Sequence, residues 1–106
     1  MATIITYDQL VQHSKENPNK LLVLKFSATW CAPCKAIVPF VEYLKTEYPN
    51  VEFHSYDIED DETMNITEQF EIAKVPSFIY FKNGIACDTI IGTNKENIEN
   101  TINDNL

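Results

Sequence analysis

The sequence predicts an α/β fold in which helices cover both faces of a mixed central sheet. Residues 21–27 form a near-continuous apolar run, which is typical of a strand covered on both faces. Beyond residue 34, apolar side chains recur at helical spacing. Two further apolar runs, 77–81 and 85–91, flank an Asn-Gly pair, which is a strong hairpin signal. The early strand–helix–strand unit requires parallel pairing and the hairpin adds antiparallel strands, so the sheet is expected to be mixed.

The expected order of elements is βαβαβαββα, which is a five-stranded sheet flanked by four helices. Two capping-box patterns open the first and last helices, Thr6 with Gln9 and Thr93 with Glu96. The chain has 106 residues, enough to bury a single core, and shows no linker or internal repeat. We therefore expect one domain over residues 1–106.

The middle of the chain alternates between helix and strand. Pro39 lies inside the helical pattern that starts at Cys34, where it removes a backbone donor and should kink the helix. Val51 and Phe53 alternate with polar neighbours, as expected for a strand. The apolar spacing over 64–70 indicates a shorter third helix.

The composition excludes some classes of function. The chain has 8 basic residues, all lysine, and a formal net charge of −8 at pH 7. Without arginine or a basic cluster there are few donors for phosphates or base edges, so nucleic-acid binding is not expected. No stretch reaches the roughly 18 apolar residues of a membrane span, and no signal-peptide pattern is visible. We therefore expect a cytoplasmic protein that does not bind membranes.

The strongest chemical signal is the pair Cys31 and Cys34, placed where the strand at 21–27 ends and a helix begins. Free N–H groups and the positive end of the dipole at a helix N-terminus favour a thiolate over a thiol. Cys31 is therefore expected to be the attacking nucleophile. Cys34 lies within the first turn, where its sulfur can reach back and resolve a mixed disulfide. Pro33 pre-sets φ for that turn, and Trp30 offers a large apolar surface beside it.

Other interpretations of the pair have less support. A zinc site would need two more ligands, and only Cys87, His13 and His54 remain, none at knuckle spacing. A structural disulfide that closes so short a loop would constrain the unfolded chain very little. Two inert cysteines by chance would be unusual. The pattern therefore favours a dithiol redox centre with no bound cofactor or metal, because two thiols carry both electrons.

The segment Phe26–Lys35, FSATWCAPCK, resembles the active-site segment of the thioredoxin family. Residues 75–78, the turn at 82–84 and the later Gly92 resemble that family's downstream landmarks, so the similarity spans nearly the whole chain. It implies a thioredoxin fold and the activity of a protein disulfide reductase that acts in electron transport and cell redox homeostasis.

The resemblance also implies how the surroundings of the dithiol are used. Pro76 would be a cis proline packed against the cysteines, and Val75 would offer its backbone to an extended substrate segment. Gly92 would keep the approach surface open near Trp30, which completes the expected substrate-binding set. From the residues alone, Pro76 marks only the start of a strand.

The partners implied by the resemblance are disulfide-containing client proteins and an NADPH-dependent thioredoxin reductase as electron donor. Implied clients include peroxiredoxins, ribonucleotide reductase and methionine sulfoxide reductase, and the chain is expected to be a monomer. Two rival functions stay open: an oxidase or isomerase with the same chemistry, and a non-catalytic protein-interaction module built on the same fold.

Two residues depart from the family's pattern. Ala32 stands where glycine is usual, and its methyl group is expected to tune rate or partner choice. Lys25, six residues before Cys31, stands where the family usually has a buried aspartate that relays a proton to or from the resolving cysteine. Two interpretations of Lys25 are open. Its ammonium reaches the surface and only its stem packs, or it stays near Cys34, either neutral or charged and stabilising a thiolate.

Three further residues receive no place in this chemistry. For Cys87, after the Asn-Gly turn, a buried position is favoured because free cysteines are usually buried. The alternative is an exposed thiol that is open to glutathionylation or to a dimer-forming disulfide. His13 and His54 lie on polar faces with no evident partner.

Overall fold

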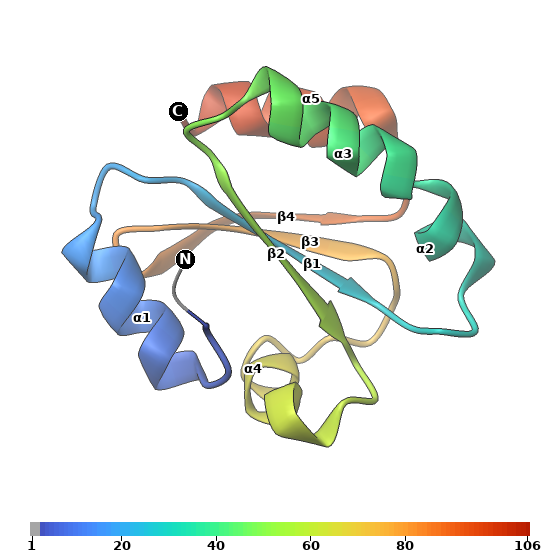
Figure 1. The fold of residues 1–106 in the computed structure, drawn as a ribbon, viewed down its shortest axis with the longest axis horizontal. Helices are drawn as coiled ribbons and strands as arrows, with labels where there is room; N and C mark the ends of the chain where they lie inside the picture. The colour runs from blue at the N-terminus through green and yellow to red at the C-terminus, as the bar shows by residue number, and fades with distance from the viewer. Residues whose placement is uncertain (1–2) are drawn as a thin grey trace.

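A computed structural model describes residues 3–106, which fold around a four-stranded sheet with helices on both faces (Figure 1). Helices α3 and α5 lie on one face, and α1 and α4 lie on the other. The strands are β1 (Leu22–Ser27), β2 (Glu52–Asp57), β3 (Ser77–Lys82) and β4 (Ile85–Ile91). The helices are α1 (Tyr7–Glu16), α2 (Ala32–Ala36), α3 (Val38–Glu47), α4 (Met64–Gln69) and α5 (Lys95–Asp104), with a 3-10 turn η1 (Asp61–Thr63) before α4.

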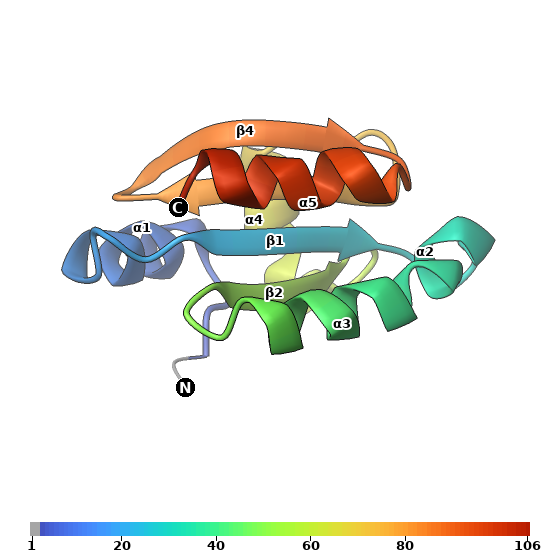
Figure 2. The ribbon, with the colours of Figure 1, turned by 90° about the horizontal axis from the view of Figure 1, so that it is seen from above.

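The sheet is mixed, as predicted. Its spatial order is β2-β1-β3-β4, so β2 and β4 form the two edges (Figure 2). Strand β1 pairs in parallel with β2 and antiparallel with β3, and β3 pairs antiparallel with β4. Strand β1 is thus central and buried along most of its length, which explains why the sequence there is almost continuously apolar.

The prediction of five strands is wrong for the described part of the chain. Residues 3–5, which precede α1, form no strand, and residues 1 and 2 lie outside the described residues. This segment is instead held in place by the side chain and the carbonyl group of Ile4. Ile4 is only 6% exposed, and its carbonyl oxygen accepts a hydrogen bond from the Tyr56 hydroxyl at 3.3 Å. Burial of one apolar side chain therefore takes the place of a sheet ladder here.

The described residues also form five α-helices where four were predicted. The helical pattern that begins at Cys34 is divided between α2 and α3, which meet at Ile37. Pro39 has no N–H to donate to the carbonyl of residue 35, so a continuous helix would lose a hydrogen bond there. The first N–H groups of a helix have no partner within the helix, so Pro39 in the first turn of α3 removes no hydrogen bond. The predicted kink is therefore a complete break, visible in Figure 1 as a change of direction.

Alternation along β1 sends apolar side chains into two separate core layers. Val23 faces the layer beneath α3 and α5, where Ile37, Val41 and Ile98 are also buried. Leu22, Leu24 and Phe26 of β1 face the opposite layer, beneath α1 and α4. That second layer consists of Ile4, Leu10, Leu22, Leu24, Phe26, Tyr56, Ile66, Ile79 and Phe81. Two buried layers fix β1 firmly, and β1 leads directly to the cysteine pair.

The hairpin predicted from the Asn-Gly pair is present. Asn83 and Gly84 both have positive φ, 51° and 78°, as a tight turn between twisted strands requires. The Gly84 N–H donates to the Ser14 hydroxyl at 2.8 Å, so the turn is also joined to α1. Within residues 3–106, none of the helices is both long and apolar enough to span a bilayer.

One of the two predicted capping boxes is correct. Thr6 and Gln9 form the reciprocal hydrogen bonds at the start of α1. The box at Thr93 and Glu96 is wrong, because the last helix begins one residue later than that pattern implies. Asn94 is the N-cap of α5, and its side chain accepts from the N–H of Asn97 at 3.0 Å. Asparagine caps at least as well as threonine, so two adjacent candidates competed for one position.

Candidate active site

The two cysteines lie at the N-terminus of α2 and are joined by a disulfide. Their Cα atoms are 5.3 Å apart. Cys31 is the N-cap of α2, and its Sγ accepts a hydrogen bond from the Cys34 N–H at 3.2 Å. This is a side-chain cap in which sulfur stands where an oxygen usually does. The cap holds the Cys31 sulfur in front of the free N–H groups of the helix, where negative charge is favoured.

A loop from the other side of the sheet covers the disulfide. The carbonyl oxygen of Val75 lies 3.8 Å from the Cys31 Sγ, and the Val75–Pro76 peptide bond is cis. The Gly92 N–H donates to the Pro76 carbonyl at 2.9 Å. Strand pairing between β1 and β3 thus brings residues more than 40 positions apart onto one small surface.

Trp30 stands at the edge of this surface. Its side chain is 66% exposed, and its indole Nε1–H donates to the Glu59 carboxylate at 3.0 Å. The two cysteines beside it are nearly covered, at 4% and 2% exposure. A large accessible aromatic face next to a shielded disulfide is suited to contact with another polypeptide.

Lys25 lies beneath the dithiol and not at the surface. It is 7% exposed, and its Nζ donates to the Cys34 carbonyl oxygen at 3.3 Å. Burial is the main cause that lowers the pKa of Lys25. The positive charge of Lys45 lowers it further and the negative charge of Glu42 opposes the change. Lys25 forms no ion pair with a carboxylate among residues 3–106.

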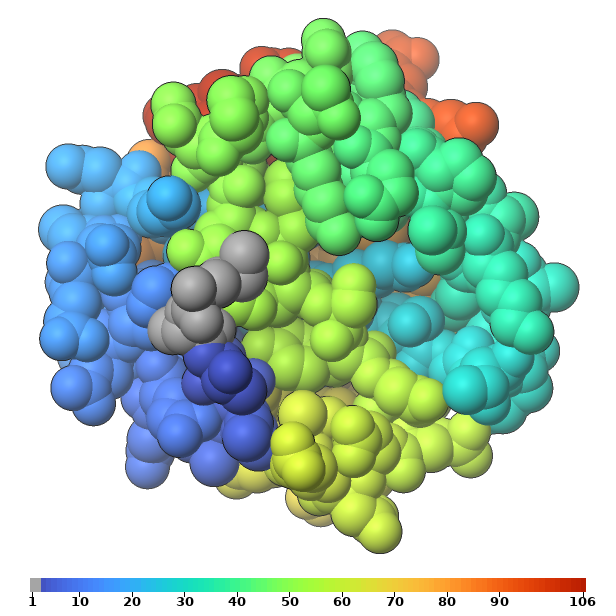
Figure 3. All heavy atoms as spheres, viewed as in Figure 1, coloured from blue at the N-terminus to red at the C-terminus, as the bar shows by residue number. Residues whose placement is uncertain are grey.

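A cavity of about 170 Å³ adjoins Lys25 and Cys34. In the space-filling view, light-blue atoms from the end of β1 are visible in a hollow between α3 and the segment after β2 (Figure 3). The charged side chains of Lys35 and Asp57 also line it, together with Ser27. Water and protons can therefore approach the Cys34 side of the disulfide from solvent.

Comparison with known proteins agrees with this geometry. The family model described as Thioredoxin matches residues 2–104. The chain belongs to the thioredoxin family. It is 42% identical to human thioredoxin over 86 residues, which cover 81% of this chain and 80% of that protein. The solved structure of Fasciola hepatica thioredoxin is 32% identical, with full coverage of both chains and a TM-score of 0.87. Mitochondrial thioredoxin 3 from Saccharomyces cerevisiae is 34% identical, covering 95% and 92% of the two chains with a TM-score of 0.83.

As a member of the thioredoxin family, the chain is a disulfide oxidoreductase that works by thiol–disulfide exchange at its redox-active cysteine pair. Thioredoxins generally act on disulfide substrates and are reduced by thioredoxin reductase. An intact pair in the expected place does not favour the rival function of a non-catalytic interaction module. The thioredoxin fold predicted from the sequence is confirmed.

The structure corrects the expectation for the two histidines. His13 on α1 and His54 on β2 each place Nε2 2.7 Å from the same oxygen, Oε2 of Glu52. Because a carboxylate only accepts, each histidine donates its Nε2–H. The i, i+2 spacing of Glu52 and His54 was a signal that they share one face of a strand. The contact with His13 joins residues 39 positions apart and had no local signal.

The prediction that Cys87 is buried is also wrong, since its side chain is exposed. Strand β4 is an edge of the sheet, and its side chains are exposed except for the half-buried Ile90. Partial burial raises the pKa of the Cys87 thiol, and Asp88 adds to this while Lys82 opposes it. Alternation identifies which residues share a face, and it does not tell whether a helix covers that face.

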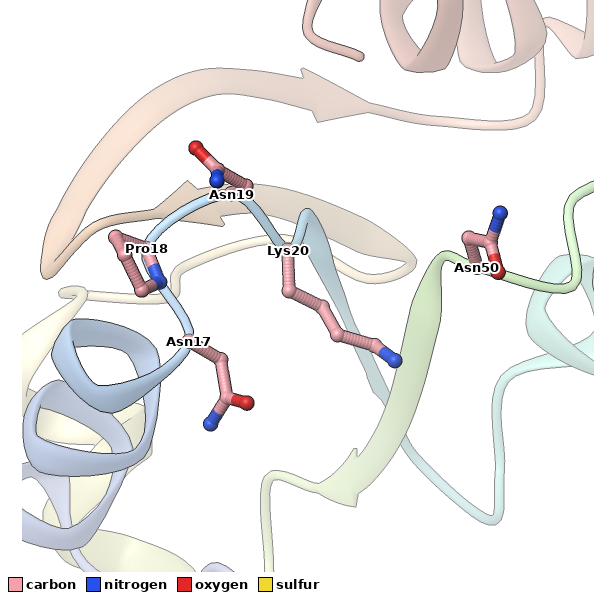
Figure 4. A pocket seen from close by; sticks show the side chains of 5 residues that line it. All are labelled: Asn17, Pro18, Asn19, Lys20 and Asn50. Carbon is pink, nitrogen blue, oxygen red and sulfur yellow. The ribbon is translucent and has the colours of Figure 1, made fainter.

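A second hollow lies far from the dithiol. Asn17, Pro18, Asn19, Lys20 and Asn50 line it, near the start of β1 (Figure 4). The side chain of Asn19 points away from those of Asn17 and Lys20, so the polar groups do not converge on a common point. This hollow lacks the convergent polar groups of a binding site.

Proposed function

We propose that this protein is a protein disulfide reductase that carries electron pairs from an NADPH-dependent thioredoxin reductase to disulfides in client proteins. The observation that carries this proposal is the Cys31–Cys34 disulfide at the N-terminus of α2, next to an exposed Trp30. Such a disulfide can be opened and closed again without rearrangement of the core, because both sulfurs lie within one helical turn.

Cys31 is the nucleophile in this proposal, and Cys34 resolves. In the reduced protein the Cys31 thiolate attacks one sulfur of a client disulfide, and the other client sulfur leaves as a thiolate. Cys34 then gives up its proton and attacks the Cys31 Sγ, which releases the second client sulfur. The client gains two electrons and the chain returns to the disulfide. The Cys34 N–H at 3.2 Å supports the role of Cys31, because it stabilises negative charge on that sulfur. Pro33 supports the turn that keeps the two sulfurs in reach of one another.

Clients are expected to bind across Trp30, Val75, Pro76 and Gly92. An extended segment can pair with the backbone at Val75, as in strand addition, because the carbonyl group there already faces Cys31. At Gly92 the φ angle is 105°, and an added Cβ would meet no atom within 4 Å. A side chain at that position would project into the space that a client needs, besides being strained.

We further infer that the protein acts as a cytoplasmic monomer with one thioredoxin domain over residues 1–106, and that it maintains cell redox homeostasis through electron transport to its clients. Its expected clients are peroxiredoxins, ribonucleotide reductase and methionine sulfoxide reductase. The net charge of −8 supports partners whose contact surfaces carry positive charge.

The test is NADPH-coupled reduction of insulin in the presence of a thioredoxin reductase. We expect turnover by the parent protein, none by Cys31→Ser, and a trapped mixed disulfide with insulin for Cys34→Ser, detected by intact mass. Cys87→Ser is the matched control, because it removes a thiol outside the site and should keep full turnover. Turnover by Cys31→Ser, or none by the parent, would overturn the proposal.

A further inference from the structure

The amine of Lys25 is a buried donor with one polar partner. Its Nζ reaches the Cys34 carbonyl oxygen, and no carboxylate within residues 3–106 forms an ion pair with it. Taking an ammonium group out of water without a counter-charge is unfavourable. The cost can be offset when a negative charge develops nearby. In this molecule the group beside Lys25 that gains such a charge is Cys34, on reduction of the disulfide.

The other charges around Lys25 come from three elements. Lys35, just after Cys34 on α2, and Asp57, at the end of β2, line the same cavity as Lys25. Glu42 and Lys45 on α3 form an i, i+3 ion pair with each other at 3.2 Å. Their effects on Lys25 oppose each other, because the carboxylate favours the ammonium form and the lysine disfavours it. Water and salt screen the exposed charges of Lys35, Glu42 and Lys45. The buried Lys25 and the half-buried Asp57 are screened less, and Lys25 is the cation of these two.

We propose that Lys25 is a positioning residue whose ammonium group favours the thiolate form of reduced Cys34 and thereby makes the dithiol a weaker reductant. The inference rests on the proposed disulfide reductase function and adds a determinant of its redox potential. The Cys34 proton passes to water in the adjoining cavity, while Lys25 keeps its own protons. The thiolate then attacks Cys31 as described above. A neutral disulfide gains nothing from the ammonium group, so the lysine stabilises the reduced form selectively.

The first experiment measures ionisation of Cys34 directly. In a Cys31→Ser, Cys87→Ser background, Cys34 is the remaining thiol, and thiolate absorbance near 240 nm is followed against pH. We expect Lys25→Met to shift the midpoint of this titration to higher pH, so that the proton concentration at the midpoint is about tenfold lower than in the parent. The matched control is Lys20→Met, which removes the same charge near the opposite end of β1, in the hollow of Figure 4. It should leave the midpoint unchanged.

The second experiment measures the redox equilibrium of the intact dithiol against glutathione. Measured at a pH above the Cys34 midpoint, Lys25→Met should favour the disulfide over the parent by up to about tenfold, which for a two-electron couple is at most about 30 mV. Lys25→Gln keeps a donor for the Cys34 carbonyl but carries no charge, and should behave like Lys25→Met. Lys25→Asp should shift the equilibrium in the same direction. It should also turn over faster, because a carboxylate can accept the Cys34 proton.

The outcomes separate this inference from the proposed function. Replacing a buried unpaired charge with methionine is expected to leave the fold intact, which chemical denaturation of each variant checks. Parental midpoints and redox equilibria in Lys25→Met, or parental behaviour of Lys25→Gln, would overturn the role of the ammonium charge. Insulin reduction by these variants would meanwhile continue. The parent protein could fail to reduce insulin while Lys25→Met still shifts the Cys34 midpoint. That result would contradict the proposed reductase function and support the electrostatic effect of Lys25.

Discussion

The three cysteines show how far position, and not residue type, decides reactivity. Cys31 is the N-cap of α2. Its Sγ accepts a hydrogen bond from the Cys34 N–H at 3.2 Å and lies 3.8 Å from the Val75 carbonyl oxygen. Cys87 lies within the edge strand β4, and its Sγ donates to the nearby carbonyl oxygen of Ile85 at 3.6 Å. The Cys31 sulfur is held where negative charge is favoured, whereas the partial burial of the otherwise exposed Cys87 raises the pKa of its thiol.

Exposure of Cys87 leads to a labelling prediction. In the oxidised protein, a maleimide should modify one thiol per chain under native conditions, because Cys31 and Cys34 are joined in a disulfide. Intact mass spectrometry measures the added mass. Cys87→Ser should abolish labelling, and full labelling of that variant would contradict the assignment. Labelling should be faster at higher pH, because the pKa of the Cys87 thiol is raised and the thiolate is the reactive form.

Among the elements, α1 is attached to the sheet by polar contacts at two places. The buried Ser14 hydroxyl accepts from the Gly84 N–H in the β3–β4 turn, and His13 contacts Glu52 on β2. The first contact supports a turn whose two central residues already have positive φ. The helix thus links the β3–β4 hairpin to the β2 edge.

Ser14→Ala should lower the free energy of unfolding by about 1–2 kcal/mol, because it leaves the Gly84 N–H without its acceptor. Denaturant titration of parent and variant measures the difference. Ser55→Ala is a suitable control, since Ser55 is exposed on β2 and its loss should change stability by less than about 0.5 kcal/mol. Equal stability of Ser14→Ala and the parent would contradict this role of Ser14 and show that water accepts the hydrogen bond from the Gly84 N–H in the variant.

For the molecule as a whole, the response to acid depends partly on Glu52. Burial raises the pKa of Glu52, but the hydrogen bonds from His54 and His13, together with their charges, outweigh burial and hold it below the ordinary value of 4.5. A carboxyl group whose pKa is lower in the folded state stabilises the fold fully above its unfolded pKa. That contribution is lost as the pH falls through the folded value.

We therefore expect the free energy of unfolding to decrease below about pH 4.5 in the parent, and Glu52→Gln to lack that part of the decrease. At neutral pH the variant should be less stable by about 1–2 kcal/mol, because it loses charge-assisted hydrogen bonds to two histidines. Denaturant unfolding from neutral pH to about pH 3 tests this, with the exposed Glu96→Gln as control. A Glu52→Gln variant with the parental pH dependence would contradict the assignment.

Features set by neighbours along the chain were predictable. The Thr6–Gln9 cap, the turn at Asn83 and Gly84, and the cysteine pair at a strand-to-helix junction all depend on residues within about four positions of each other. Hydrophobic periodicity likewise identified β1 and α4, because burial on one or both faces leaves a regular pattern. The dithiol chemistry was therefore available from the sequence.

Features that depend on which segments become neighbours required the tertiary structure. The sequence alone determined the cysteine pair, the mixed sheet and the hairpin. Only the tertiary structure decided that Lys25 lies beneath Cys34, that His13 and His54 share Glu52, and that β4 leaves Cys87 exposed. The physical reason is that burial and electrostatic coupling act through space between segments far apart in the chain, whereas caps, turns and helical spacing act along it.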